Sequence, residues 1–466
     1  AQLKGDLELQ TPSWFGPLFV GCQLAGGMSC RGIPRTPLEQ FAACLRDAKE
    51  LTFNFPMYVV PMEKVLQMTE VRPHQDLLRD GELNIFDPAK GKAMFVSHQW
   101  TTEQHPDPEG KQLKIFQQAM ANLLAGRVVA HPNAWAEMVF SIAGGSAEGS
   151  EGVKASKLIQ TPILVWYDYF CVPQYPVIGL RSRSLSDNQF QDQRNAIASI
   201  PAYIDRCDFF VALCPLLKHS TSPSALSRQS WEQRGWCRAE AVVRDLSVKN
   251  GLTLIIQSPQ QVSLAVTCSM LKAPGDGQFT VPGDRKLVGE LVKGVLQQKL
   301  HNALRDRELP RYRFLLNHQS ALLRKSDTTP VSGFLENGSV DVSRGVEALA
   351  EDFLLQNGFE KVSDHDRSGW SPLLYAALGG KPDVVEALLL QRADPNDFIR
   401  KPQNLVMFVK GFQALSICAV QKHNEAMRVL LRFRADPNKQ DPRGAAPLFY
   451  VADSDNVEGA RILIEA

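Results

Sequence analysis

The last quarter of the chain repeats itself. The segment 366–377 recurs as 441–452, and the tetrapeptide 393–396 recurs as 435–438. A single unit of such a repeat cannot bury its own apolar face, so neighbouring units must stack. The repeat therefore predicts an elongated stack of similar helical units at this end of the chain.

The period and the turn sequence resemble those of the ankyrin repeat. Leu415 and Leu448 hold the same place in successive units, 33 residues apart, which is the length of an ankyrin unit of a turn and two helices. The resemblance implies about three all-α units over 345–466, the last one incomplete, that bind a protein partner. Trp370 is expected near a turn tip. The leucines expected to be buried between units are Leu373, Leu388, Leu415, Leu430 and Leu448.

An alternation of strands and helices precedes the repeat. Short apolar runs predict strands near 93–97, 162–168, 208–213 and 252–257. Amphipathic segments predict helices at 110–124, 191–206 and 231–248. Strands that alternate with helices predict a parallel sheet with helices on both faces.

The remaining segments complete the expected organisation. Residues 1–92 are expected to form a loop-rich extension with short helices, 93–307 the α/β domain, 308–344 a linker and 345–466 the repeats. The segment 143–150 is rich in Gly and Ser and predicts a flexible insertion. Because the chain starts without Met and stops inside a helical pattern, we expect it to be a piece of a longer protein.

The charge balance gives no support for a polyanionic partner. With 51 basic and 50 acidic residues, the net charge of +1 gives no electrostatic reason to bind nucleic acid or an anionic membrane. No segment approaches the roughly 20 apolar residues of a membrane span. The nine cysteines include no CxxC pair, which favours free thiols in the cytoplasm. A zinc site at Cys207, Cys214 and His219 is not favoured, because metal ligands usually come in closer pairs.

Polar side chains end the predicted strands. Ser97 and His98 follow the first strand, Asp168 ends the second, and Glu240 lies in a Trp-Cys-x-x-Glu motif after the third. Ligands of parallel α/β sheets bind at this carboxyl edge. The alternative is structural: His98 caps the sheet, Asp168 caps a turn, and Glu240 favours a helix start. A Cys171–His98 nucleophile pair is a weaker hypothesis, since a Cys between Phe and Val is usually inert.

These motifs, in this order, resemble a divergent TIR (Toll/interleukin-1 receptor-like) domain over 93–307. The resemblance rests on Phe95-Val96-Ser97, on Asp168 and above all on Trp236-Cys237-x-x-Glu240. It implies a flavodoxin-like sheet, self-association, and cleavage of NAD at the nicotinamide–ribose bond. NAD would then be the substrate and no cofactor would be needed.

The resemblance also assigns roles to residues. Glu240 would be the catalytic carboxylate and Trp236 would line the pocket, with Ser97, His98 and Asp168 beside the substrate. Plant-type members carry Phe-Arg-Gly where this chain has His98-Gln99-Trp100, so the arginine that would meet phosphate is missing. Two arginines near the motif, Arg234 and Arg238, are candidates to replace it.

Two functions follow from the sequence. One is an intracellular TIR-like signalling protein that cleaves NAD and binds a protein partner through its ankyrin repeats. The alternative is a non-catalytic scaffold in which both parts serve protein–protein interaction. The position of Glu240, Trp236 and Ser97 distinguishes them, because only the enzyme requires these side chains to surround one open pocket.

Overall fold

The computed structural model of the chain describes residues 36–132, 161–174, 187–219, 225–247, 249, 253–264, 269–335, 345–403, 406 and 408–466. The expected insertion at 143–150, all residues before 36, part of the expected linker, and Cys22, Cys30 and Cys268 lie outside these residues.

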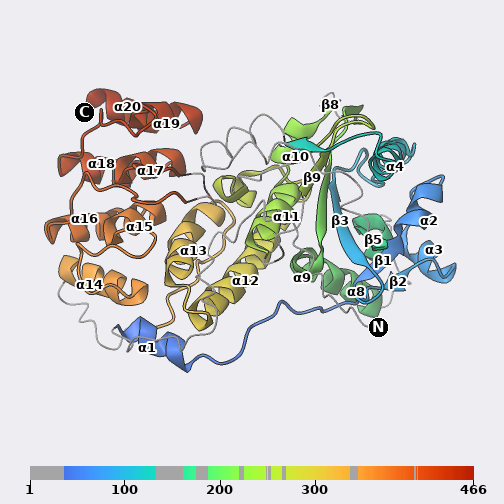
Figure 1. Cartoon of the computed structure of the whole chain (residues 1–466), viewed down its shortest axis with the longest axis horizontal. Helices are drawn as coiled ribbons and strands as arrows, with labels where there is room; N and C mark the ends of the chain where they lie inside the picture. The colour runs from blue at the N-terminus through green and yellow to red at the C-terminus, as the bar shows by residue number, and fades with distance from the viewer. Residues whose placement is uncertain are drawn as a thin grey trace, which may run out of the picture.

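The centre of the α/β part is a parallel sheet (Figure 1). Its four strands are β3 (Lys92–His98), β5 (Ile163–Tyr167), β6 (Phe209–Leu213) and β9 (Thr253–Ile256), in the spatial order β5-β3-β6-β9. Each is parallel to its neighbours in this group. The four predicted strands and their parallel pairing are thus confirmed.

The edges of the sheet differ from the prediction. β1 (Tyr58–Pro61) is antiparallel to β5, and β2 (Asn84–Ile85) is antiparallel to β1. On the other side β10 (Val262–Leu264) is antiparallel to β9, and β4 (His131–Pro132) is parallel to β10. The described residues therefore form an eight-stranded, mostly parallel sheet. These edge strands are too short to show a period in the sequence. The edges of β5 and β9 pair with β1 and β10, which pair in turn with β2 and β4.

Helices cover both sides of the sheet. Figure 1 shows α11 (Gly235–Leu246) and α12 (Asp284–Arg305) on the opposite side of β3 from α2 (Met62–Gln67) and α4 (Lys111–Leu124). The remaining elements of this part are α1 (Pro37–Cys44), α3 (His74–Arg79), α7 (Asp168–Cys171), α8 (Asp187–Ala198), α9 (Ile200–Arg206), α10 (Arg228–Gln233), the hairpin of β7 (Leu217–Lys218) and β8 (Ala225–Leu226), and the 3-10 turns η2 (Ser269–Leu271) and η3 (Pro274–Asp276).

Aromatic side chains anchor the core under these helices. The ring of Phe95 on β3 stacks on Trp166 of β5 at 4.4 Å and on Phe210 of β6 at 5.4 Å between centroids. Cross-strand aromatic pairs of this kind stabilise a sheet beyond the area they bury. The three rings fix the order of the central strands, and with it the edge where the polar residues lie.

The repeat region forms two rows of helices (Figure 1). One row is α13 (Leu309–Leu322), α15 (Pro372–Gly379), α17 (Ala414–Gln421) and α19 (Pro447–Asp453). The other is α14 (Val346–Asn357), α16 (Pro382–Leu390), α18 (Asn424–Arg432) and α20 (Val457–Glu465). The stack therefore begins with α13, inside the segment predicted to be a linker. Since α13 also packs on α12, the stack is continuous with the α/β part.

A buried aspartate marks the same turn in two units. Asp366 accepts hydrogen bonds from the backbone N–H groups of Ser368 and Trp370 and from the hydroxyl of Tyr375. Asp441, 75 positions later, holds its own turn and the hydroxyl of Tyr450 in the same way. The repeated sequence therefore forms the same hydrogen bonds in both turns.

One expectation for the repeat core is wrong, and a second holds only in part. Leu448 is 46% exposed, whereas Leu373, Leu388, Leu415 and Leu430 are buried as predicted. Leu448 is exposed because α19 ends its row, so no described helix covers its outer side. Trp370 does lie in the turn held by Asp366, but it is 1% exposed and packs against Tyr375, so the turn does not present its ring to solvent.

The exposure difference gives a test of the repeat core. Leu415→Ala is expected to lower the free energy of unfolding by about 2–5 kcal/mol, because truncating a buried leucine leaves a cavity. Leu448→Ala is the matched control, with an expected change of about 0.5 kcal/mol or less. Urea denaturation of both variants measures the difference, and equal effects would place Leu415 outside the core.

Candidate functional site

Ser97 and Glu240 meet at the carboxyl edge of the sheet. Ser97 is fully buried near the end of β3, and Glu240 comes from α11, which packs on β3. The hydroxyl of Ser97 donates a hydrogen bond to Oε2 of Glu240. The pairing spans 143 residues of sequence, and it confirms that these two predicted residues share one place in the fold.

A second pair lies beside the first. Nε2 of His98 donates to Oδ1 of Asp168 at 2.8 Å, and the indole Nε1 of Trp100 donates to Oδ2 of the same carboxylate at 2.9 Å. The His98 ring stacks on Tyr167 at 4.0 Å between centroids. Asp168 opens α7 directly after β5, so the register of β3 and β5 brings the pair together. The structural role expected of Asp168 is present as well, because it accepts the N–H of Tyr169 at 2.6 Å.

The charges of these groups depend on one another. Burial raises the pKa of Glu240, the nearby Asp168 carboxylate raises it further, and together they outweigh the Ser97 hydrogen bond, which brings the pKa to about 8. Burial opposes ionisation of Asp168 too, but the charge and hydrogen bond of His98 more than offset this and lower its pKa. Burial alone would lower the pKa of His98, yet Asp168 leaves it raised. Two neighbouring carboxyl groups thus have pKa values shifted in opposite directions, which is common at functional sites.

Trp236 makes no hydrogen bond to this cluster, although it lies one helical turn before Glu240 on α11. Its indole Nε1 donates to Oδ2 of Asp284 at 2.9 Å, at the start of α12. The tryptophan hydrogen-bonded to Ser97 is Trp231 of α10, whose Nε1 donates to the hydroxyl oxygen at 3.0 Å. The predicted helix at 231–248 is in fact two helices, because the backbone of Arg234 is extended between α10 and α11. This break turns Trp231 and Trp236 in different directions, and no pattern in the sequence indicates it.

Trp231 fixes the direction of the Ser97 hydrogen bond. A serine hydroxyl has one proton and can accept as well as donate. Because Trp231 occupies an acceptor position of Ser97, the hydroxyl proton is left to point at Glu240. Trp231 is a residue of the candidate site that the sequence patterns missed.

The other predicted groups face elsewhere. Arg234 donates to Thr280, and Arg238 donates to the carbonyl groups of Glu232 and Ala273. Neither arginine therefore supplies the charge that the site lacks.

Cys171 is not a nucleophile of this site. Its thiol points toward the carbonyl oxygen of Val165 at 3.9 Å, and burial raises its pKa well above the usual range. Neither ring nitrogen of His98, the base that such a nucleophile would need, contacts Cys171, because Nε2 faces Asp168 and Nδ1 faces the hydroxyl of Tyr167. The thiolate that nucleophilic catalysis requires is therefore strongly disfavoured.

The side chains of the cluster differ in their exposure to solvent. The side chain of Asp168 is 33% exposed, whereas that of His98 is 2% exposed. Trp100 and Glu240 are partly exposed.

Two cavities of about 690 and 500 Å³ lie elsewhere, the first between 49–52 and α12 and the second around Arg307 and Arg313. Neither cavity includes Glu240, so the open pocket required by the enzyme hypothesis is not one of them.

Comparison with known families places one part of the chain. The model of the ankyrin repeat family matches residues 368–398, which span α15 and α16. An ankyrin repeat is present here. Stacked ankyrin repeats present an extended surface that binds protein partners. No match is found among curated proteins.

Two further features concern ligands and membranes. Among the residues that the structure describes, no group of three or more His, Cys, Asp or Glu side chains could hold a metal ion. Within the same residues, no helix is long and apolar enough to cross a membrane.

Proposed function

We propose that the α/β part is a TIR-like domain that cleaves NAD at the nicotinamide–ribose bond, while the ankyrin repeats bind a protein partner. The observation that carries the proposal is the placement of Glu240, hydrogen-bonded to Ser97, beside Asp168 and His98 at the carboxyl edge of a parallel sheet. Perturbed carboxylates at this edge mark ligand sites in α/β folds.

The order of the strands supports the TIR-like assignment. Numbered along the chain, the four parallel strands lie in the order 2-1-3-4, as in flavodoxin-like sheets. The polar residues follow the first and second of these strands and the helix after the third. The proposed domain therefore includes β1 and β2 from the segment before residue 92, because they extend the same sheet.

The chemistry requires an ionised carboxylate. When the bond between C1′ of ribose and the nicotinamide nitrogen breaks, its electron pair leaves with nicotinamide and positive charge develops on the ribose. A carboxylate at Glu240 stabilises this charge, as in glycoside hydrolysis. Water then attacks C1′ and loses a proton, giving ADP-ribose, nicotinamide and H⁺. Ser97 holds the carboxylate in place through its hydroxyl.

The pKa of Glu240 predicts the pH dependence of this reaction. Because the pKa is about 8, the required ionised form grows about tenfold per pH unit below 8 and levels off above it. kcat/KM is therefore expected to rise from pH 6 to pH 8 by roughly 50-fold. Nicotinamide release by the purified chain, measured from pH 6 to 9.5, tests this. A profile that falls above pH 8 would instead mean that the protonated carboxyl acts as a general acid.

The non-catalytic scaffold is the second candidate. Two observations favour it: Trp236 points to α12, and neither cavity described above contains Glu240. In this case Glu240 and Ser97 only fasten α11 to β3. A folded chain that releases no nicotinamide at any pH from 6 to 9.5 would establish the scaffold and exclude the enzyme.

A further inference from the structure

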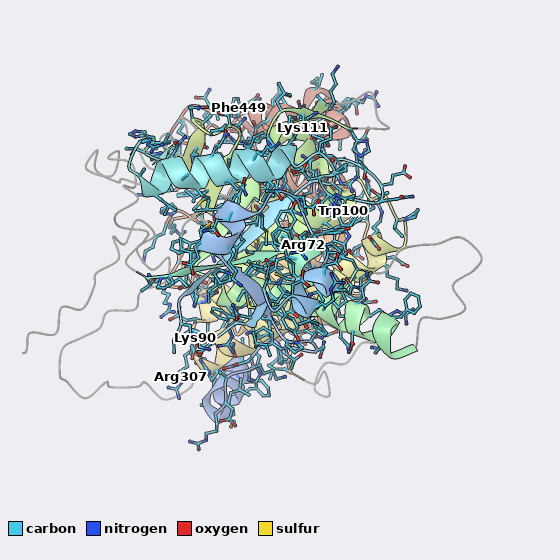
Figure 2. The ribbon with its side chains drawn as sticks, turned by 90° about the vertical axis from the view of Figure 1, so that its right-hand side faces the viewer. Arg72, Lys90, Trp100, Lys111, Arg307 and Phe449 are labelled. Carbon is cyan, nitrogen blue, oxygen red and sulfur yellow. The ribbon has the colours of Figure 1, made fainter. Side chains whose placement is uncertain are left out.

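Trp100 and Asp168 are hydrogen-bonded neighbours among the solvent-exposed members of the polar cluster. Trp100 comes two residues after the end of β3, and Figure 2 labels it in the view onto the α/β part. Its indole is partly exposed, and the Asp168 side chain is 33% exposed. A molecule that approaches the cluster from solvent would meet these two groups before it meets the buried His98 and Ser97.

The Trp100 ring is held in one orientation. Its Nε1 donates to Asp168 at 2.9 Å, and its ring stands perpendicular to that of Tyr169, at an interplanar angle of 84°. Tyr169 is supported in turn by His105, with ring centroids 4.7 Å apart. The Tyr169 contact is edge-to-face, and no described ring is stacked in parallel on Trp100. An oriented ring of this kind needs little ordering when it stacks on a ligand.

The charge next to the ring selects the ligand. Asp168 keeps its negative charge at neutral pH, since His98 and Trp100 lower its pKa although burial opposes this. An indole face attracts cations, and the Asp168 carboxylate at its edge adds to that preference, although His98 offsets part of its charge. Planar cationic rings should therefore bind here better than neutral ones.

We propose that Trp100 and Asp168 form a subsite for the pyridinium ring of a nicotinamide nucleotide, with the ring stacked on Trp100. This proposal extends the proposed function and rests on it, because a pyridinium ring bound in the subsite would place the nicotinamide–ribose bond next to Glu240. It gives the stacking role to Trp100, in place of Trp236.

The test is binding of nicotinamide mononucleotide, whose pyridinium ring is cationic, to the full chain carrying Glu240→Gln. Turnover is not required in this background, so the result does not depend on catalysis. Isothermal titration should show that Trp100→Leu weakens binding at least tenfold. Trp100→Phe, which restores an aromatic face, should stay within about threefold of the parent, as expected for stacking. Trp236→Phe is the matched control and should leave the affinity unchanged.

Three outcomes would overturn the subsite. The first is unchanged affinity in a folded Trp100→Leu variant. The second is equal loss in the Leu and Phe variants, which would assign Trp100 a role through its N–H and not through its ring. The third is AMP binding more tightly than nicotinamide mononucleotide, which would make the ligand a neutral base. The proposed function fails separately, if wild-type protein binds the nucleotide through Trp100 but releases no nicotinamide from NAD.

Discussion

Glu240→Gln is expected to lower nicotinamide release from NAD by roughly 10²-fold or more, because removing a principal electrostatic stabiliser has effects of this size. The amide can still accept the hydrogen bond from Ser97, but it carries no charge to oppose the one that develops on ribose. The loss should appear in kcat as well as in kcat/KM, since the interaction is strongest in the transition state. A continuous assay of nicotinamide release measures both.

The stability of the variant shows that the loss is not caused by unfolding. The pKa of Glu240 is about 8 in the folded chain, against an ordinary value of 4.5. The folded chain thus holds this proton more tightly than the unfolded chain, and the contribution of Glu240 to stability falls as pH rises from 4.5 to 8. Since Gln mimics the protonated form, the variant should be at least as stable as wild type at pH 8.

The matched control for activity is Glu290→Gln. Glu290 is exposed on α12, faces Lys293 at 4.0 Å and lines the cavity of about 690 Å³, which does not include Glu240. Its activity should stay within about twofold of wild type. If Glu240→Gln retained activity as well, the carboxylate would have no catalytic role, and its pairing with Ser97 would be structural.

Arg313→Met is expected to lower the free energy of unfolding by about 3–5 kcal/mol, the usual cost of removing one partner from a buried ion pair. Arg313 on α13 and Asp366 have side chains that are 6% and 3% exposed and lie 3.2 Å apart. Arg313 also donates to the carbonyl groups of Asn357 and Gly358. The substitution would leave these acceptors and the Asp366 charge without their partner, at the point where the stack begins.

An exposed arginine provides the comparison. Arg428 on α18 pairs with Glu425 and Glu458, and all three side chains are at least 44% exposed. Arg428→Met should cost about 1 kcal/mol or less, because solvent screens such pairs. Urea denaturation of both variants decides the matter. A loss below about 1 kcal/mol for Arg313→Met would show that water reaches Asp366 once the arginine is gone.

The candidate site was only partly predictable from the sequence. Strand-end polarity indicates Ser97, His98 and Asp168, since an apolar run followed by a polar residue is a local pattern. The Trp-Cys-x-x-Glu motif indicates Glu240 and Trp236, but it does not indicate Trp231, the tryptophan that is hydrogen-bonded to Ser97. Trp231 reaches Ser97 across 134 residues of sequence, and the extended backbone at Arg234 that turns it there has no local signal.

The sequence by itself determined the features that depend on local periodicity. Short apolar runs predict the four central strands, and a period of about 33 residues predicts the stacked units. Both predictions succeed because the spacing of apolar residues shows which face of each element must be buried. The tertiary structure alone decided how those faces meet. It added β1 and β2 to the free edge of β5, joined α13 to the stack, and left Leu448 exposed at the end of its row. The pKa of Glu240 belongs to this second group too, because it depends on burial and on charges contributed by distant segments.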